Sequence, residues 1–171
     1  MVNVMYNEYI KNVFENLNTL KQVSGMRSSI LSVELSLPRQ CGKTTAIAKI
    51  ACDGNNVIII ARNHPCTLDI KRLVDEIEAN AEATARKSLT SIFKHKVKVQ
   101  EKFDKNSIYS VNSISNMGRS YTDISGINLT IILDELTVDS FISMMSKHSI
   151  NTHMLNLIRM GEIPILSINS K

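Results

Sequence analysis

The spacing of apolar residues predicts that the chain opens with a helix. Apolar residues recur at intervals of three and four from Val4 to Leu20, which is the period of an amphipathic helix. Residues 1–25 are therefore expected to form an N-terminal helix and its connector. Similar helical patterns occur in four later segments: Thr44–Cys52, Leu68–Ala85 (with Pro65 as a helix opener), Asp139–Lys147 and Asn151–Met160.

Short apolar and β-branched runs alternate with these helices. They predict strands at Ile30–Leu37, Val57–Ala61, Ser107–Val111, Leu129–Leu133 and Ile163–Ile168. A Ser-, Asn- and Gly-rich loop is expected at Asn112–Ile127. Strands and helices that alternate in this way indicate one three-layer α/β domain over residues 1–171, with a mainly parallel sheet and helices on both faces.

Composition narrows the class of protein. With 171 residues, of which 43% are hydrophobic, the chain is long enough for one sizeable core. The formal net charge of +4 suits a polyanionic partner but is weak support for DNA binding. The three cysteines form no CxxC pair, and no stretch approaches the roughly 20 apolar residues of a membrane span. A cytoplasmic protein without membrane contact is expected.

The segment Leu37–Thr45 lies between a predicted strand and a predicted helix, where a phosphate-binding loop belongs. Gly42 would allow a tight turn, Lys43 would reach the β and γ phosphates of ATP, and Thr44 would ligate Mg²⁺. The alternative is an ordinary strand–turn–helix in which Gly42 only caps a bend. The candidate nucleotide-binding residues are Gln40, Cys41, Gly42, Lys43, Thr44 and Thr45.

Two adjacent acids end the strand predicted at Leu129–Leu133. Ligands of open parallel sheets gather at the carboxyl ends of the strands, which is where Asp134 and Glu135 would lie. Asp134 would hold Mg²⁺ through water, and Glu135 would polarise the water that attacks the γ phosphate. A solvated helix cap is the alternative, and the phosphate loop upstream favours the catalytic interpretation.

The sequence ProArgGlnCysGlyLysThrThr resembles the deviant phosphate loop of the large terminase subunits of tailed bacteriophages. That family replaces the first glycine of the loop, as Leu37 does here, and carries Arg and often Gln before GlyLysThr. The resemblance implies that Arg39 acts on the γ phosphate. It also implies a P-loop ATPase fold, with ATP and Mg²⁺ as cofactors.

Weaker parts of the resemblance lie elsewhere in the chain. The family's coupling motif, a small-hydroxyl tripeptide at the end of the next strand, is similar to Leu166–Ser170, so the resemblance implies a coupling role for Ser167 and Asn169. Met117–Ser120 is a loose counterpart of its Arg- and Gly-containing loop. Gln22 is the candidate for adenine recognition.

A concentrated positive segment runs from Arg86 to Lys105. Lys94, Lys96 and Lys98 alternate, so on a strand they would share one face within reach of a nucleic-acid backbone. A solvated surface loop is the favoured alternative, because no aromatic residues interleave to stack on bases.

The hypothesis that joins these features is a magnesium-dependent ATPase similar to the terminase motor. It would couple ATP hydrolysis to translocation or packaging of double-stranded DNA, as a homo-oligomeric ring or with a partner subunit, in the cytoplasm of a phage-infected host. One alternative is a helicase-like or recombination ATPase. A second is a non-catalytic module that binds nucleotide or a partner subunit. A small-molecule kinase fits less well, since kinases seldom end the catalytic strand in AspGlu.

Overall fold

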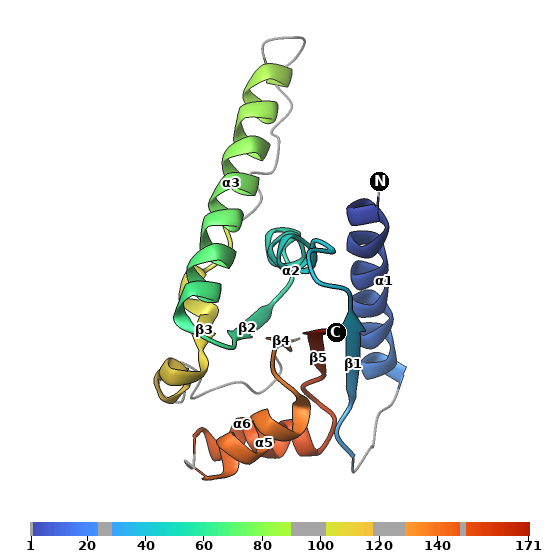
Figure 1. The fold of residues 1–171 in the computed structure, drawn as a ribbon, viewed down its shortest axis with the longest axis vertical. Helices are drawn as coiled ribbons and strands as arrows, with labels where there is room; N and C mark the ends of the chain where they lie inside the picture. Colours follow the sequence, from blue (N-terminus) through green and yellow to red (C-terminus); the bar gives the residue numbers. More distant parts are fainter. Residues whose placement is uncertain (1, 24–28, 90–101, 118–128, 148–149) are drawn as a thin grey trace.

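The chain folds around a five-stranded parallel sheet. The structure is a computed structural model that describes residues 2–23, 29–89, 102–117, 129–147 and 150–171. The strands lie in the order β1-β5-β4-β2-β3, and each neighbouring pair is parallel (Figure 1). Their bounds are β1 Ser32–Leu37, β2 Val57–Ala61, β3 Ile108–Ser110, β4 Thr130–Asp134 and β5 Ile165–Ser170.

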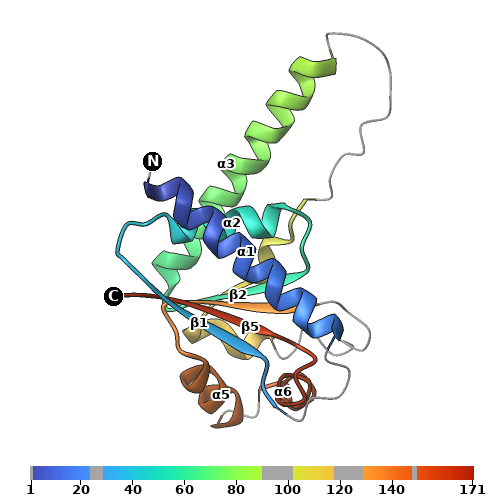
Figure 2. The ribbon, with the colours of Figure 1, turned by 90° about the vertical axis from the view of Figure 1, so that its right-hand side faces the viewer.

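Helices cover both faces of the sheet. Helices α1, α2 and α3 lie on one face, and α5 and α6 lie on the other (Figure 2). The expected three-layer α/β fold is thereby confirmed. The helix bounds are α1 Val2–Val23, α2 Lys43–Cys52, α3 His64–Leu89, α5 Val138–Lys147 and α6 Thr152–Arg159. Among the described helices, none is both long and apolar enough to cross a membrane.

Alternation along the strands divides the core between the two faces. Ile132 of β4 and Leu166 of β5 pack with α1, α2 and α3, whereas their neighbours Ile131 and Ile165 pack with α5 and α6. Strands β2 and β4 are buried along their whole length. Burial on both faces explains why these two strands read as continuous apolar runs in the sequence.

Several boundaries differ from those expected. Strand β1 begins at Ser32 rather than Ile30, and β5 covers Ile165–Ser170 rather than Ile163–Ile168. Part of the expected loop is ordered as the 3₁₀ helix η2, Val111–Asn116, whose start is stabilised by a capping box between Ser110 and Ser113. Residues 118–128 of that loop lie outside the described part of the chain.

Helix α3 begins at His64, one residue before Pro65, the expected helix opener. Asn63 explains the difference, because its Oδ1 accepts a hydrogen bond of 3.0 Å from the Cys66 backbone N–H and its carbonyl accepts one of 3.3 Å from Thr67. Pro65 therefore lies at the second helical position. An N-cap asparagine, not the proline, sets the start of this helix.

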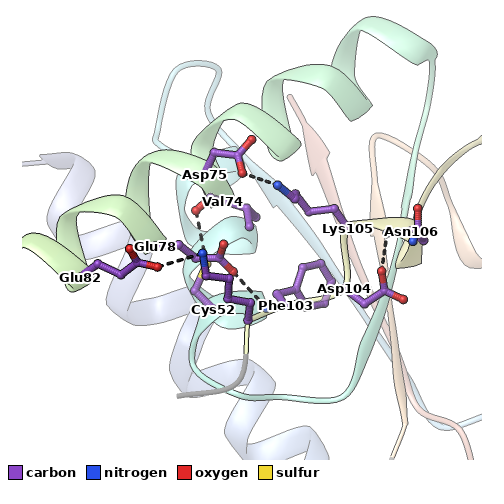
Figure 3. Close-up of polar contacts among 10 residues, drawn as sticks. Cys52, Val74, Asp75, Glu78, Glu82, Phe103, Asp104, Lys105 and Asn106 are labelled. Atoms are coloured by element: carbon purple, nitrogen blue, oxygen red, sulfur yellow. Dashed lines mark hydrogen bonds and ion pairs between the residues drawn. The ribbon is translucent and has the colours of Figure 1, made fainter. Parts of the chain in front are cut away.

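Helix α3 projects beyond the sheet, and residues 102–106 run back along it (Figures 1 and 3). The Phe103 backbone N–H donates to Glu78 Oε1 at 3.0 Å, and Lys102 forms an ion pair with Glu82 at 2.8 Å. Beyond Glu78, the side chains of residues 79–84 are all exposed. The projecting part of the helix is thus supported by polar contacts rather than by the core.

These contacts bear on the positive segment found in the sequence. Lys102 pairs with Glu82, and Lys105 of the short 3₁₀ helix η1, Lys105–Ser107, pairs with Asp75. Exposed pairs of this kind contribute little to stability, but they offset the charge of two of the segment's cations. Lys94, Lys96 and Lys98 lie outside the described residues, so their contact with DNA stays a prediction.

Candidate functional site

The turn from β1 into α2 contains two residues in the left-handed region. Gln40 has a φ of 58° and Gly42 a φ of 83°. Glycine adopts this region without steric cost, whereas a residue with a Cβ loses about 1–2 kcal/mol there. The turn therefore favours a glycine at position 42, and it holds Gln40 in an unfavourable conformation that the sequence does not reveal.

Helix α2 begins directly after this turn with an open N-terminus. Its first hydrogen bond runs from the Ala46 N–H to the Gly42 carbonyl at 3.0 Å, and Gly42 has no side chain with which to cap the earlier N–H groups. Helix α3 differs, because Asn63 caps it. Uncapped N–H groups and the helix dipole favour anions. The N–H groups at this helix start therefore have no side-chain cap at Gly42 that would compete with an anion.

The side chains of the loop fall into three groups. Arg39 and Gln40 are exposed, whereas Thr44 and Thr45 are half-buried. Cys41 is only 3% exposed and packs in the core with α1 and α2. Its thiol fills space beneath the turn, so only the backbone of Cys41 remains for a ligand. The side chain of Arg39 is exposed to solvent beside the turn.

Lys43, the first residue of α2, meets two side chains from the ends of other strands. Its Nζ forms an ion pair with Glu135 Oε1 and donates a hydrogen bond to Ser170 Oγ at 2.6 Å. Ser170 in turn donates to Glu135 through its hydroxyl, and its backbone N–H donates to Glu135 Oε2 at 3.0 Å. The three side chains form one closed cluster.

Sheet topology explains why Ser170 can join Lys43 to Glu135. Strand β5 lies between β1, which leads into the turn, and β4, which leads to Glu135. Ser170 is in register with Leu37, the last residue of β1, and the Lys171 N–H donates to the Leu37 carbonyl at 2.8 Å. Ser170 therefore sits at the carboxyl end of the middle strand of the three.

Backbone conformation brings Glu135 to the same place. In a regular strand Glu135 would lie on the face of α5, opposite Asp134. Its φ of 59° is left-handed instead, and its N–H donates to the Ile168 carbonyl at 3.0 Å. This conformation costs a non-glycine residue on the order of 1–3 kcal/mol. The contacts to Lys43 and Ser170 offset that cost.

Asp134 is the buried acid of the pair. It is 3% exposed, and its Oδ1 has no hydrogen-bond partner among the described residues. Burial raises the pKa of the Asp134 carboxyl above its ordinary value, and the Lys43 ammonium offsets part of the rise. A buried carboxylate oxygen without a hydrogen-bond partner is unfavourable, so a cation bound at Oδ1 would relieve this cost.

The carboxylate of Asp134 is a donor of the kind that Mg²⁺ uses. The described residues contain no group of three or more His, Cys, Asp or Glu side chains able to hold a metal ion. Mg²⁺ usually keeps several waters and binds through one or two carboxylates together with phosphate oxygens. Asp134 is a carboxylate of this kind, and Thr44, the second residue of α2, is half-buried.

Ser167 and Asn169, the residues with an implied coupling role, lie apart from this cluster. They alternate with Ser170 along β5, so they belong to the opposite face of the sheet. Asn169 Nδ2 donates to Ser167 Oγ at 3.0 Å, and Ser167 Oγ donates to the Leu136 carbonyl at 2.8 Å. They hold the backbone that directly follows Glu135.

Glu34 of β1 supports the same stretch of chain. Its Oε1 accepts a hydrogen bond of 2.7 Å from the Val138 N–H at the start of α5. Neither Glu34 nor Ser170 was expected at the site from the sequence. Ser170 could have been found by extending β5 to its polar end, because alternation from Leu166 and Ile168 places Ser170 on the face that carries α2.

Comparison with family models, with curated proteins and with solved structures finds no match to this chain. The terminase resemblance therefore depends on the loop and strand residues themselves. Of its weaker parts, the side chain of Gln22 and residues 118–120 lie outside the described residues, although Met117 is buried in the core.

Proposed function

We propose that this chain is a magnesium-dependent ATPase domain whose triphosphate site is the N-terminus of α2. The observation that carries the proposal is the meeting of Lys43, Asp134 and Glu135 at the carboxyl edge of the sheet. A cation at an uncapped helix start, an unpartnered buried carboxylate and a second carboxylate are the groups that phosphoryl transfer from ATP requires.

Each residue has a distinct part in binding. The backbone N–H groups at the start of α2 would receive phosphate oxygens, and Lys43 would reach the β and γ phosphates. Asp134 and Thr44 would hold Mg²⁺, which supplies charge neutralisation to the phosphates. Arg39, exposed on the same turn, is the candidate for a further contact to the γ phosphate.

Hydrolysis would use Glu135. Its carboxylate would orient a water molecule and accept its proton as the water oxygen attacks the γ phosphorus, while the bond to the ADP oxygen breaks. Ser170 would position Glu135 through its backbone N–H and its hydroxyl. Ser167 and Glu34 would steady the backbone that follows Glu135.

This ATPase domain would couple hydrolysis to movement of DNA. This part of the proposal derives from the likeness of the loop sequence to that of large terminase subunits and from the positive segment between Arg86 and Lys105. Exposed acids of α3 already pair with Lys102 and Lys105. Lys94, Lys96 and Lys98 are the candidates for contact with a DNA backbone.

A second candidate is a module that binds nucleotide without appreciable turnover. The ion pair between Lys43 and Glu135 favours it, since that contact engages the two groups that hydrolysis requires. Both candidates predict nucleotide binding. They differ in whether phosphate is released.

The test compares Lys43→Ala with Lys49→Ala, which removes an exposed lysine from the same helix. Binding of ATP is measured by calorimetry, and phosphate release is measured with and without double-stranded DNA. We expect Lys43→Ala alone to lose binding, and turnover of the parent protein to rise with DNA. Equal ATP affinity in the two variants would show that the phosphate site is elsewhere, whereas binding without turnover would select the module.

A further inference from the structure

The carboxylate of Glu135 engages Lys43 where a phosphate would. Lys43 and Glu135 form an ion pair, and their side chains are only 12% and 25% exposed. Ion pairs that are shielded from water attract more strongly than those on an open surface. The lysine that the proposed function assigns to phosphates is thus already bound to an anion of the same chain.

Ser170 contacts both members of this ion pair and holds the Glu135 carboxylate in place. Its hydroxyl contacts both Lys43 Nζ and Glu135 Oε1, and its backbone N–H holds Glu135 Oε2. Both carboxylate oxygens of Glu135 therefore have partners within the cluster. Hydrogen bonds to charged groups are stronger than those between neutral groups, and bonds joined in a network can strengthen one another.

The backbone of Glu135 shows that these contacts compete with a conformational preference. Glu135 is one of three non-glycine residues with positive φ in the described chain. The left-handed conformation is unfavourable for a glutamate, so it persists because the surrounding contacts hold it. Breaking the contacts to Lys43 would remove one of the interactions that keep Glu135 turned toward the phosphate site.

We propose that Lys43, Glu135 and Ser170 form a latch in which the Glu135 carboxylate competes with the terminal phosphate of a nucleoside triphosphate for Lys43. The proposal builds on the function proposed above. A triphosphate has to displace Glu135 from Lys43, and the displaced carboxylate is then free to meet water. Binding of the triphosphate would therefore also free the Glu135 carboxylate for catalysis.

Glu135→Gln tests the latch, because it keeps the shape of the side chain and removes its charge. Binding of a non-hydrolysable triphosphate and of the diphosphate is measured by calorimetry. We expect Glu135→Gln to bind the triphosphate about tenfold more tightly than the parent, since a competing charge-assisted contact is lost. The gain for the diphosphate should be smaller. Glu162→Gln is the matched control, as Glu162 is exposed and precedes β5 at the opposite edge of the sheet.

A second measurement examines the latch without any nucleotide. Lys43 and the exposed Lys49 are compared in their rates of acylation by acetic anhydride, read by mass spectrometry. We expect Lys43 to react much more slowly than Lys49 in the parent protein, and faster in Glu135→Gln. Ser170→Ala should raise the Lys43 rate as well, by a smaller factor, because the backbone N–H of residue 170 remains.

The outcomes separate the latch from the function. A parent protein that binds triphosphate, together with a Glu135→Gln variant that binds it no more tightly, overturns the latch and leaves the ATPase proposal intact. Equal acylation of Lys43 and Lys49 in the parent also overturns it. Suppose that Glu135 protects Lys43 from acylation, but neither the parent nor Glu135→Gln binds nucleotide. The contact between the two residues would then be real, whereas the ATPase proposal and the competition with a triphosphate would both be refuted.

Discussion

Thr130, the first residue of β4, donates a hydrogen bond to Asn18 Oδ1 on α1 at 2.7 Å. The two residues are far apart in the sequence, and Thr130 is 2% exposed. This contact ties the N-terminal helix to the strand that leads to Asp134. It lies at the start of β4, at the opposite end of that strand from the candidate site.

Thr130→Val should destabilise the fold without changing the site. Valine keeps the shape of threonine but removes the donor to Asn18, so we expect a loss of roughly 1 kcal/mol in the free energy of unfolding. Thr19→Val is the control, because the Thr19 hydroxyl only donates to the Glu15 carbonyl on an exposed turn of α1. Urea denaturation measures both. An equal effect of the two substitutions would mean that the bond to Asn18 contributes nothing.

Gly42→Ala should damage both stability and nucleotide binding. A Cβ at a φ of 83° costs about 1 kcal/mol, and it would also stand where phosphate oxygens approach the turn. Gly54→Ala provides the comparison, since Gly54 has a φ of 80° in the turn after α2. We expect similar losses of stability in thermal melts, with nucleotide affinity lost only in Gly42→Ala. Loss of affinity in both would point to a general effect of folding.

Asp134→Asn should make the protein more stable at neutral pH. Burial raises the pKa of Asp134 in the folded chain above the ordinary 3.8. Below that value the carboxyl is protonated in both the folded and unfolded states, and the variant has no advantage. As the pH rises, the unfolded chain releases the proton more readily, so the parent loses stability until the folded-state pKa is passed.

Denaturation of Asp134→Asn and the parent from about pH 3 to pH 8 measures this difference. We expect the stability of the variant relative to the parent to rise between about pH 4 and neutral pH, because asparagine carries no charge to bury. Added Mg²⁺ and nucleotide should stabilise the parent more than the variant, because only the parent retains the carboxylate. A parent that is more stable than the variant across the whole range would mean that Asp134 has a favourable partner in the fold.

The positive segment predicts DNA binding that weakens steeply with salt. If Lys94, Lys96 and Lys98 each contact a phosphate, replacing all three with alanine should flatten the slope of log affinity against log salt by about 2.7, at about 0.9 per contact. Lys102→Ala with Lys105→Ala should change the slope little, because α3 carries acids opposite both. Fluorescence anisotropy with a DNA duplex measures the slopes. No binding of DNA by the parent at low salt would contradict the motor hypothesis for this chain.

Much of the fold follows from the hydrophobic pattern. The buried strands β2 and β4 are continuous apolar runs bounded by polar residues, so their ends were predicted to within one residue. The helix α2 was likewise predicted to within one residue, because its alanines and isoleucines are buried in the core. Where burial alone decides the bounds of an element, the sequence is sufficient to predict them.

The predicted ends of elements were wrong where polar contacts, rather than burial, decide where the element ends. Strand β5 continues through Asn169 and Ser170 because their backbones pair with β1 across the sheet, although their side chains are polar. The early start of α3 depends on the Asn63 cap. The order of the strands, which places Ser170 between Lys43 and Glu135, depends on long-range pairing that a single sequence does not reveal.

The candidate site was therefore foreseen in part. GlyLysThr between a strand and a helix, and AspGlu at a strand end, located the residues that the fold brings together. The left-handed conformation of Glu135 and its capture by Lys43 were not foreseeable, because no glycine or asparagine marks that position. The catalytic and nucleotide-binding roles of these residues stay predictions until they are measured.

Helix α3 has a geometry with mechanical consequences. It begins at the carboxyl edge of the sheet, where burial and the charge of Asp134 raise the pKa of the Cys66 thiol in its first turn. Its 26 residues span about 39 Å at 1.5 Å per residue, so a tilt of about 5° near Cys66 moves the other end by about 3 Å. If the first turn of the helix moved together with Asp134, the length of the helix would magnify that displacement in the exposed turns far from the sheet.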